Sequence, residues 1–134
     1  MKSIIVRSLL SISGLIATGV GAATLFAPEQ FHAMSGISLE DSASLMSEIR
    51  APGGLLLVSG LLIALGAFVS RVMFSALALS ALIYLSYGVS RLWSMIVDGM
   101  PANALIQAAG LELFIGTACV LAAFMNRNGI SNQR

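Results

Sequence analysis

Four long apolar segments, separated by short polar stretches, dominate the pattern of hydrophobic and polar positions along this chain. They cover residues 8–26, 53–70, 72–97 with Arg91 inside, and 101–125 with Glu112 inside. A helix that spans a bilayer needs about 20 apolar residues, and none of these segments shows the two-residue alternation of a strand. The pattern predicts an all-α, integral membrane domain over 1–134, with spans at about 4–27, 52–69, 72–97 and 101–125.

The short connections between the segments predict which helices are neighbours. Little more than Ser70 and Arg71 separates the second segment from the third, which predicts a tight helical hairpin. Asp98 and Gly99 form a turn after the third segment, and Pro101 suits the first turn of the fourth helix. The third and fourth helices are therefore also expected to be neighbours, in an antiparallel four-helix bundle.

The connection between the first and second segments is longer, at residues 28–51. Within it, "SLEDSASLMSEIR" offers Ser38 or Asp41 as a helix N-cap. We expect a short interfacial helix in this first outer loop, at the level of the lipid headgroups. It either continues into the second span or breaks at Pro52.

Small residues recur every three or four positions within the apolar segments. Helices in lipid associate through close packing of small residues, since lipid chains are as apolar as leucine. Seven glycines are expected at helix contacts: Gly14, Gly21, Gly53, Gly54, Gly60, Gly88 and Gly116.

The composition agrees with a membrane protein and excludes several functions. The chain is 57% hydrophobic and 10% charged, with a mean hydropathy of +0.94, whereas soluble domains carry about 25% charged residues. A net charge of +1 without a basic cluster argues against nucleic-acid binding. Cys119 and His32 are the single residues of their types, so no cysteine- or histidine-rich metal site is expected. No catalytic nucleophile or cofactor motif is present.

The first segment has two interpretations. Lys2 and Arg7 precede it, as in a signal peptide, and "VGA" is a weak cleavage site. However, its 19 uncharged residues exceed the usual 7–15-residue apolar core of a signal peptide. We therefore expect the segment to be retained as the first span.

The basic residues predict an orientation. Two of them, Arg50 and Arg91, fall near one side of the membrane. The other five fall near the opposite side: Lys2, Arg7, Arg71, Arg127 and Arg134. The positive-inside rule then places both termini in the cytoplasm.

Charges inside an apolar segment are costly and usually face the bundle in pairs. Glu112 lies eleven residues past Pro101, roughly 16 Å along a helix and close to mid-membrane. Arg91 lies about 10 Å below the outer surface by the same rise per residue. Because their helices are neighbours, we predict an ion pair between Arg91 and Glu112.

Further polar residues gather in the same half of the predicted bundle. Tyr84 and Arg91 share a helix face, with Tyr87 at its edge. Glu48 and Arg50 are two residues apart, so on a helix they point in different directions and do not pair with each other. Arg50 has Asp98 and Glu112 as candidate partners, and Glu48 has Arg91. The predicted network or ligand pocket is Glu48, Arg50, Tyr84, Tyr87, Arg91, Asp98 and Glu112.

Several motifs of this sequence resemble one protein family. "LFAPE", "SEIRAPGG", "YGVSRLWSMIVDGMP" and "LELFIG" occur in this order along the chain. They are similar to motifs of the domain-of-unknown-function 4345 family (DUF4345), small four-span membrane proteins of bacteria that are distantly DoxX-like. The resemblance implies a four-helix bundle in the bacterial inner membrane, with polar positions at Glu48, Arg50, Arg91, Asp98 and Glu112. It implies no established activity.

Three functions remain open at this point. The first is a non-enzymatic accessory or assembly protein that contacts membrane lipid and a membrane-protein partner or a second copy of itself. The second is a quinone- or lipid-binding oxidoreductase-type subunit with its site at Arg91 and Glu112. The third is a small transporter subunit, although the multidrug exporters of this size place an essential glutamate in the first span, where this chain has no acid.

Overall fold

The described part of the chain forms four long helices and two short helical segments. The structure, a computed structural model, describes residues 2–39 and 42–131. Its elements are α1 (Lys2–Phe26), α2 (Pro28–Ala33), α3 (Ala43–Phe68), the 3₁₀ turn η1 (Ser70–Val72), α4 (Met73–Val97) and α5 (Asn103–Ser131). The apolar stretches long enough to cross a membrane are Ile4–Phe26, Ala43–Phe68, Ser70–Val97 and Asn103–Asn126. The predicted all-α, four-helix membrane fold is confirmed.

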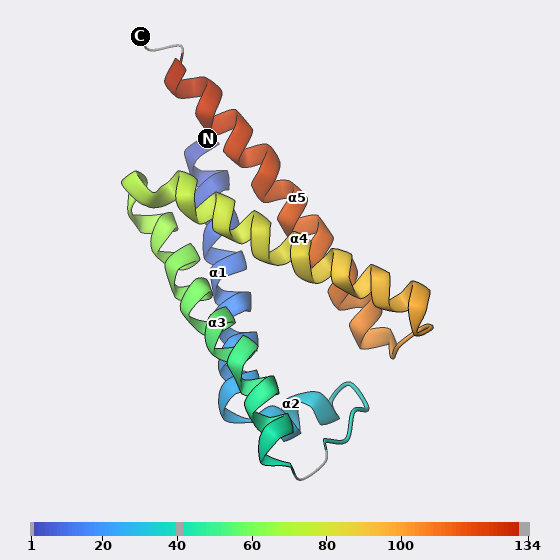
Figure 1. Cartoon of the computed structure of the whole chain (residues 1–134). Coiled ribbons are helices and arrows are strands. Elements are labelled where there is room, and N and C mark those ends of the chain that lie inside the picture. The colour runs from blue at the N-terminus through green and yellow to red at the C-terminus, as the bar shows by residue number, and fades with distance from the viewer. Residues whose placement is uncertain (1, 40–41, 132–134) are drawn as a thin grey trace.

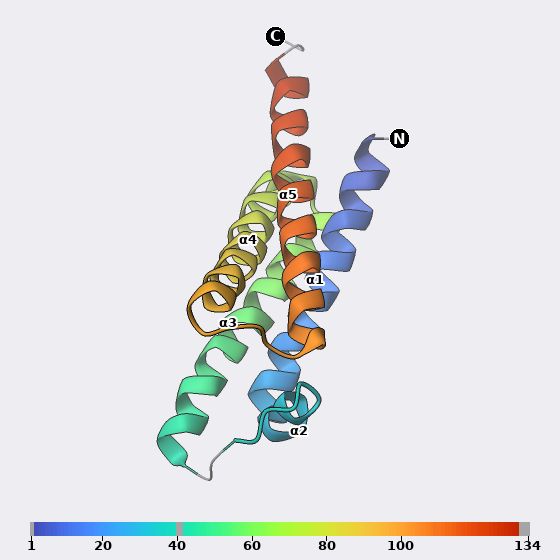
Figure 2. The same ribbon diagram turned by 90° about the vertical axis from the view of Figure 1, so that its right-hand side faces the viewer.

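The four long helices form two close antiparallel pairs. Helix α1 packs mainly on α3, and α4 packs mainly on α5. The pairs meet near η1, and α4 and α5 then diverge from α1 and α3 toward the end that carries α2 (Figure 1). We call these the η1 end and the α2 end of the bundle. Figure 2 looks from the side to which α4 and α5 diverge, so these two helices lie in front. The first turns of α1 and the last turns of α5 both lie at the η1 end (Figure 1).

Glycine allows α1 and α3 to approach until their backbones touch. A Cβ atom added at Gly14, Gly21, Gly53 or Gly60 would lie less than 3.0 Å from backbone atoms of the facing helix. These contacts follow the small-residue spacing of both segments and confirm the predicted role of the four glycines. Gly54 was wrongly predicted, because nothing lies within 4 Å of its added Cβ. It follows Gly53 directly and therefore points away from α1.

The second pair uses glycine differently. In α4, Gly88 faces the Leu113 side chain, and in α5, Gly116 faces the Leu85 side chain. Each leucine therefore fills the space left by the glycine of the other helix. Both glycines were predicted at contacts, and both predictions are confirmed.

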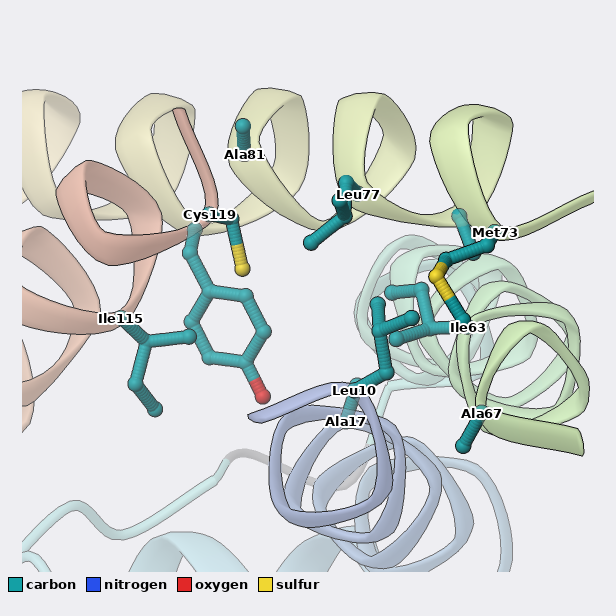
Figure 3. Close-up of a cluster of buried hydrophobic side chains, with 11 residues drawn as sticks. Leu10, Ala17, Ile63, Ala67, Met73, Leu77, Ala81, Ile115 and Cys119 are labelled. Carbon is teal, nitrogen blue, oxygen red and sulfur yellow. The ribbon is translucent and has the colours of Figure 1, made fainter. Parts of the chain in front are cut away.

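A small apolar core joins the two pairs. Leu10 of α1, Ile63 of α3 and Leu77 of α4 are completely buried, and Figure 3 shows their side chains meeting between the helices. Cys119 and Ile115 extend this core on the side of α5. Outside this core, Arg7 Nη2 donates to Ser70 Oγ at 3.3 Å and thereby links α1 to η1. The pairs are thus held together at the η1 end.

The connection between α1 and α3 differs in detail from its prediction. Its separate short helix is α2, at Pro28–Ala33, whereas the stretch expected to form it is the first part of α3. Ser42, not Ser38, is the N-cap, because its Oγ accepts from the N–H of Leu45 at 3.4 Å. Asp41 lies outside the described residues.

Pro52 does not break α3, which is continuous through it. A proline removes one backbone hydrogen bond, here to the carbonyl of Glu48. That carbonyl is in the exposed first part of α3, where water or headgroups can satisfy it.

The turn between α4 and α5 was predicted correctly in place but not in detail. Helix α4 ends at Val97 with Asp98 as its C-cap, and Gly99 has a φ of 95°, which favours glycine. Pro101 precedes α5 and is not in its first turn, since the helix begins at Asn103. The carbonyl of Ala102 accepts the first hydrogen bond, from the N–H of Leu105 at 2.9 Å.

Candidate functional site

An ion pair joins α4 to α5 in the half of the bundle nearer the α2 end. Arg91 Nε donates to Glu112 Oε2 at 2.9 Å and to Oε1 at 3.1 Å. The predicted Arg91–Glu112 pair is therefore confirmed. The Glu112 side chain is 14% exposed and that of Arg91 is 32% exposed. In the part of the chain that the structure describes, the two terminal nitrogens of Arg91 donate to no acceptor.

The ion pair forms the polar wall of a cavity of about 130 Å³ between the helix pairs. Residues of all four long helices line the cavity, in the half of the bundle where α4 and α5 diverge from α1 and α3. Tyr84 and Tyr87 contribute to the same wall as Arg91 and Glu112. The other sides are apolar, with Ile16, Val20, Leu56, Ile83, Ala108 and Leu111.

Tyr84 links the two helix pairs at the inner end of this cavity. Its buried hydroxyl donates to the backbone carbonyl of Ser13 in α1 at 2.6 Å. Tyr84 therefore stabilises the bundle, and its hydroxyl is already engaged by the protein.

Tyr84→Phe is expected to destabilise the protein by about 1 kcal/mol, the usual net value of a buried hydrogen bond. Tyr87→Phe is the matched control, because the Tyr87 hydroxyl bonds no acceptor in residues 2–39 and 42–131. Thermal unfolding in a non-ionic detergent compares the two variants. Equal melting temperatures would contradict the assigned role of Tyr84.

Three predicted site residues lie away from the cavity. Asp98 Oδ2 accepts from Ser94 Oγ at 2.8 Å, at the end of α4. Arg50 Nη1 donates to the carbonyl of Leu25 at 2.8 Å, so it caps α1 and pairs with neither Asp98 nor Glu112. Glu48 is exposed and forms no ion pair with Arg91.

The predicted polar network is therefore not continuous. The first turns of α3, which carry Glu48 and Arg50, stay against α1, while α4 and α5 diverge from them. The expected contacts across this space consequently do not form. The site keeps Tyr84, Tyr87, Arg91 and Glu112 of the predicted set.

Sequence reasoning missed a second polar contact between α4 and α5. Cys119 Sγ donates to Ser80 Oγ at 3.2 Å, and both side chains are completely buried. A serine inside an apolar segment was the available signal. Cys119 lies in the core, as its apolar neighbours indicated, and in the described residues no group of three potential ligands gathers to hold a metal ion.

One protein-family model matches most of the chain. The model described as "Domain of unknown function (DUF4345)" matches residues 5–123. The chain belongs to this family. The match includes every residue of the cavity and of the ion pair in this DUF4345 protein. No curated protein and no solved structure matches the chain.

Proposed function

We propose that this DUF4345 protein is a non-enzymatic accessory protein of a membrane that binds a lipid-like molecule between its two helix pairs. The observation that carries the proposal is the cavity itself, which is apolar on most sides and has the Arg91–Glu112 pair as one wall. Ligand sites commonly combine an apolar surface with a few placed polar groups. This arrangement suits a molecule with an apolar body and a polar head.

The size of the cavity supports an occupant that is only partly enclosed. An engineered apolar cavity of about 150 Å³ holds benzene, so about 130 Å³ accommodates one ring or a few methylene groups. The rest of a longer molecule would extend between the diverging pairs into the bilayer. The polar head would then lie at Arg91 and the tail among lipid chains.

The cost of the ion pair also favours a binding role. Removing two charges from water often costs more free energy than their attraction returns. Well-packed apolar residues in their place would often stabilise the helix contact equally or better. An ion pair needed only for stability would be expected in a fully packed interface. Here the pair borders a cavity, and among the described residues the terminal nitrogens of Arg91 have no acceptor.

A second candidate function is a quinone-binding subunit of an oxidoreductase-type complex. The room for a single ring beside the Arg91 and Tyr87 donors favours it. Trp93 is two residues from Arg91, so a bound quinone would quench its fluorescence. Titration with a short-chain quinone tests this candidate, and unchanged fluorescence would count against it.

Filling the cavity should abolish retention of the ligand. Ala108 lines the cavity on α5, and Ala108→Phe places a large ring in it. Ala104→Phe is the matched control, because Ala104 is exposed one turn earlier on the same helix. Native mass spectrometry of each variant, purified in mild detergent, measures bound lipid. We expect wild type and Ala104→Phe to retain it and Ala108→Phe to lose it; equal retention in both variants would contradict the proposal.

We also propose that the protein lies in a bacterial inner membrane with both termini in the cytoplasm. The position of Arg7 and Arg71 at the η1 end supports this orientation, because cytoplasmic loops carry the excess of basic residues. A fluorescent or alkaline phosphatase reporter fused to the C-terminus distinguishes the two sides. Phosphatase activity in such a fusion would refute the orientation.

Membrane lipid is the first partner that this proposal implies. A membrane-protein partner or a second copy of the chain would complete an accessory role. Chemical crosslinking in intact membranes, followed by purification in mild detergent, detects either. Recovery of the uncrosslinked chain alone would argue against an assembly function.

A further inference from the structure

The charge of the cavity wall restricts what its ligand can be. Arg91 and Glu112 carry opposite charges, and the Arg91 Nε lies within 3.1 Å of both Glu112 oxygens. The wall is therefore polar but has no net charge. An anionic head placed against Arg91 would also lie close to the Glu112 carboxylate.

No second cation compensates for that carboxylate in the part of the chain that the structure describes. Arg50 is engaged at the carbonyl of Leu25, outside the cavity lining. Arg7 and Arg71 lie at the η1 end, away from the cavity. Because the surroundings are apolar, the repulsion between two like charges is weakly screened here.

Hydrogen-bond donors remain available at the same wall. Arg91 Nε is committed to Glu112, whereas its two terminal nitrogens have no acceptor in residues 2–39 and 42–131. Tyr87, which carries a hydroxyl donor, lines the same cavity as Arg91. These groups suit an oxygen that accepts hydrogen bonds and carries no full charge.

We propose that the ligand is an amphiphile with an uncharged, oxygen-bearing head, such as an amide, ester or ketone carbonyl, and that Glu112 excludes anionic lipids from the cavity. This inference rests on the proposed function and specifies its ligand class. The carbonyl oxygen accepts from the terminal nitrogens of Arg91 and from Tyr87, and the tail leaves between the helix pairs. In this arrangement Glu112 both orients Arg91 and sets the selectivity.

The test compares two ligands that share one acyl chain, oleamide and oleate, at a pH where oleate is ionised. Their affinities for the full chain are measured in a non-ionic detergent from the ligand-induced rise in melting temperature. We expect wild type to prefer oleamide by about tenfold or more, because like charges juxtaposed at a binding site are strongly unfavourable. Wild type binding oleate as tightly as oleamide would overturn the inference and leave the proposed function standing.

Variants of the pair sharpen the comparison. Glu112→Gln removes the negative charge, so it should increase the affinity for oleate relative to that for oleamide about tenfold. Asp98→Asn is the matched control, because it removes an acid of the same half of the bundle that lies outside the cavity. Its selectivity should equal that of wild type. An equal gain for oleate in both variants would overturn the role of Glu112.

Different results would contradict the proposed function and the inference about the ligand class. Binding of neither ligand, together with equal lipid retention by Ala108→Phe and Ala104→Phe, overturns the proposed function and the inference with it. If only Ala108→Phe loses the lipid and wild type prefers oleate, the inference about the ligand class is overturned. The proposed function then still stands. If Glu112→Gln fails to fold, the wild-type preference between the two ligands decides the question.

Discussion

Gly21→Ala is expected to separate α1 from α3 and to destabilise the protein by about 3 kcal/mol or more, at the upper end of the usual cost of overpacking. The added methyl group would lie less than 3.0 Å from the N and Cα of Leu57 and from the carbonyl oxygen of Gly53. All three are backbone atoms, so no side-chain rotation relieves the clash. The helices must move apart along the interface, which also weakens the contacts at Gly14 and Gly60.

Gly19→Ala provides the matched control for this prediction. Gly19 is two residues away on the same helix, and nothing lies within 4 Å of its added Cβ. Since alanine favours a helix over glycine by about 1 kcal/mol, this variant should be as stable as wild type or slightly more so. Thermal unfolding in detergent compares the two. A Gly21→Ala variant as stable as Gly19→Ala would show that α1 and α3 do not pack in this register.

Periodicity in the sequence was enough to predict the helices and the small-residue face between α1 and α3. Gly14, Gly21, Gly53 and Gly60 recur at helical spacing, and close packing of small residues is the main source of helix association in lipid. The same argument failed for Gly54, because neighbouring glycines on a helix cannot both face one partner. The residue type alone does not show which of Gly53 and Gly54 faces α1.

The Arg91–Glu112 pair could be predicted because a tight turn fixes α4 and α5 as neighbours and depth along each helix fixes the residues that meet. The partners of Glu48 and Arg50 could not be predicted, since they depend on the angle between the two helix pairs. Hydrophobic spacing does not determine that angle. The acceptors used by Arg50 and Tyr84 are backbone carbonyls, of Leu25 and Ser13. Every residue has such a carbonyl, so the sequence contains no signal for either bond.

Replacing either Arg91 or Glu112 alone should destabilise the protein. Replacing both should cost less stability than the sum of the two single replacements. Removing one partner of a buried pair costs about 3–5 kcal/mol, because it leaves an uncompensated charge. The Arg91 and Glu112 side chains are 32% and 14% exposed, so we expect values near the lower limit, about 3 kcal/mol. Arg91→Gln/Glu112→Gln leaves no charge unpaired and should recover part of this loss.

The two single variants should also differ from each other. In Glu112→Gln, the long side chain of Arg91 can extend toward the headgroups, as arginines near helix ends do. In Arg91→Gln, the shorter and less exposed Glu112 has no such route, so this variant should be the less stable one. A double-mutant cycle of unfolding free energies in detergent measures both the order and the coupling. Additive effects would mean that the two side chains do not interact in the folded protein, and a less stable Glu112→Gln would place the carboxylate, not the arginine, within reach of the membrane surface.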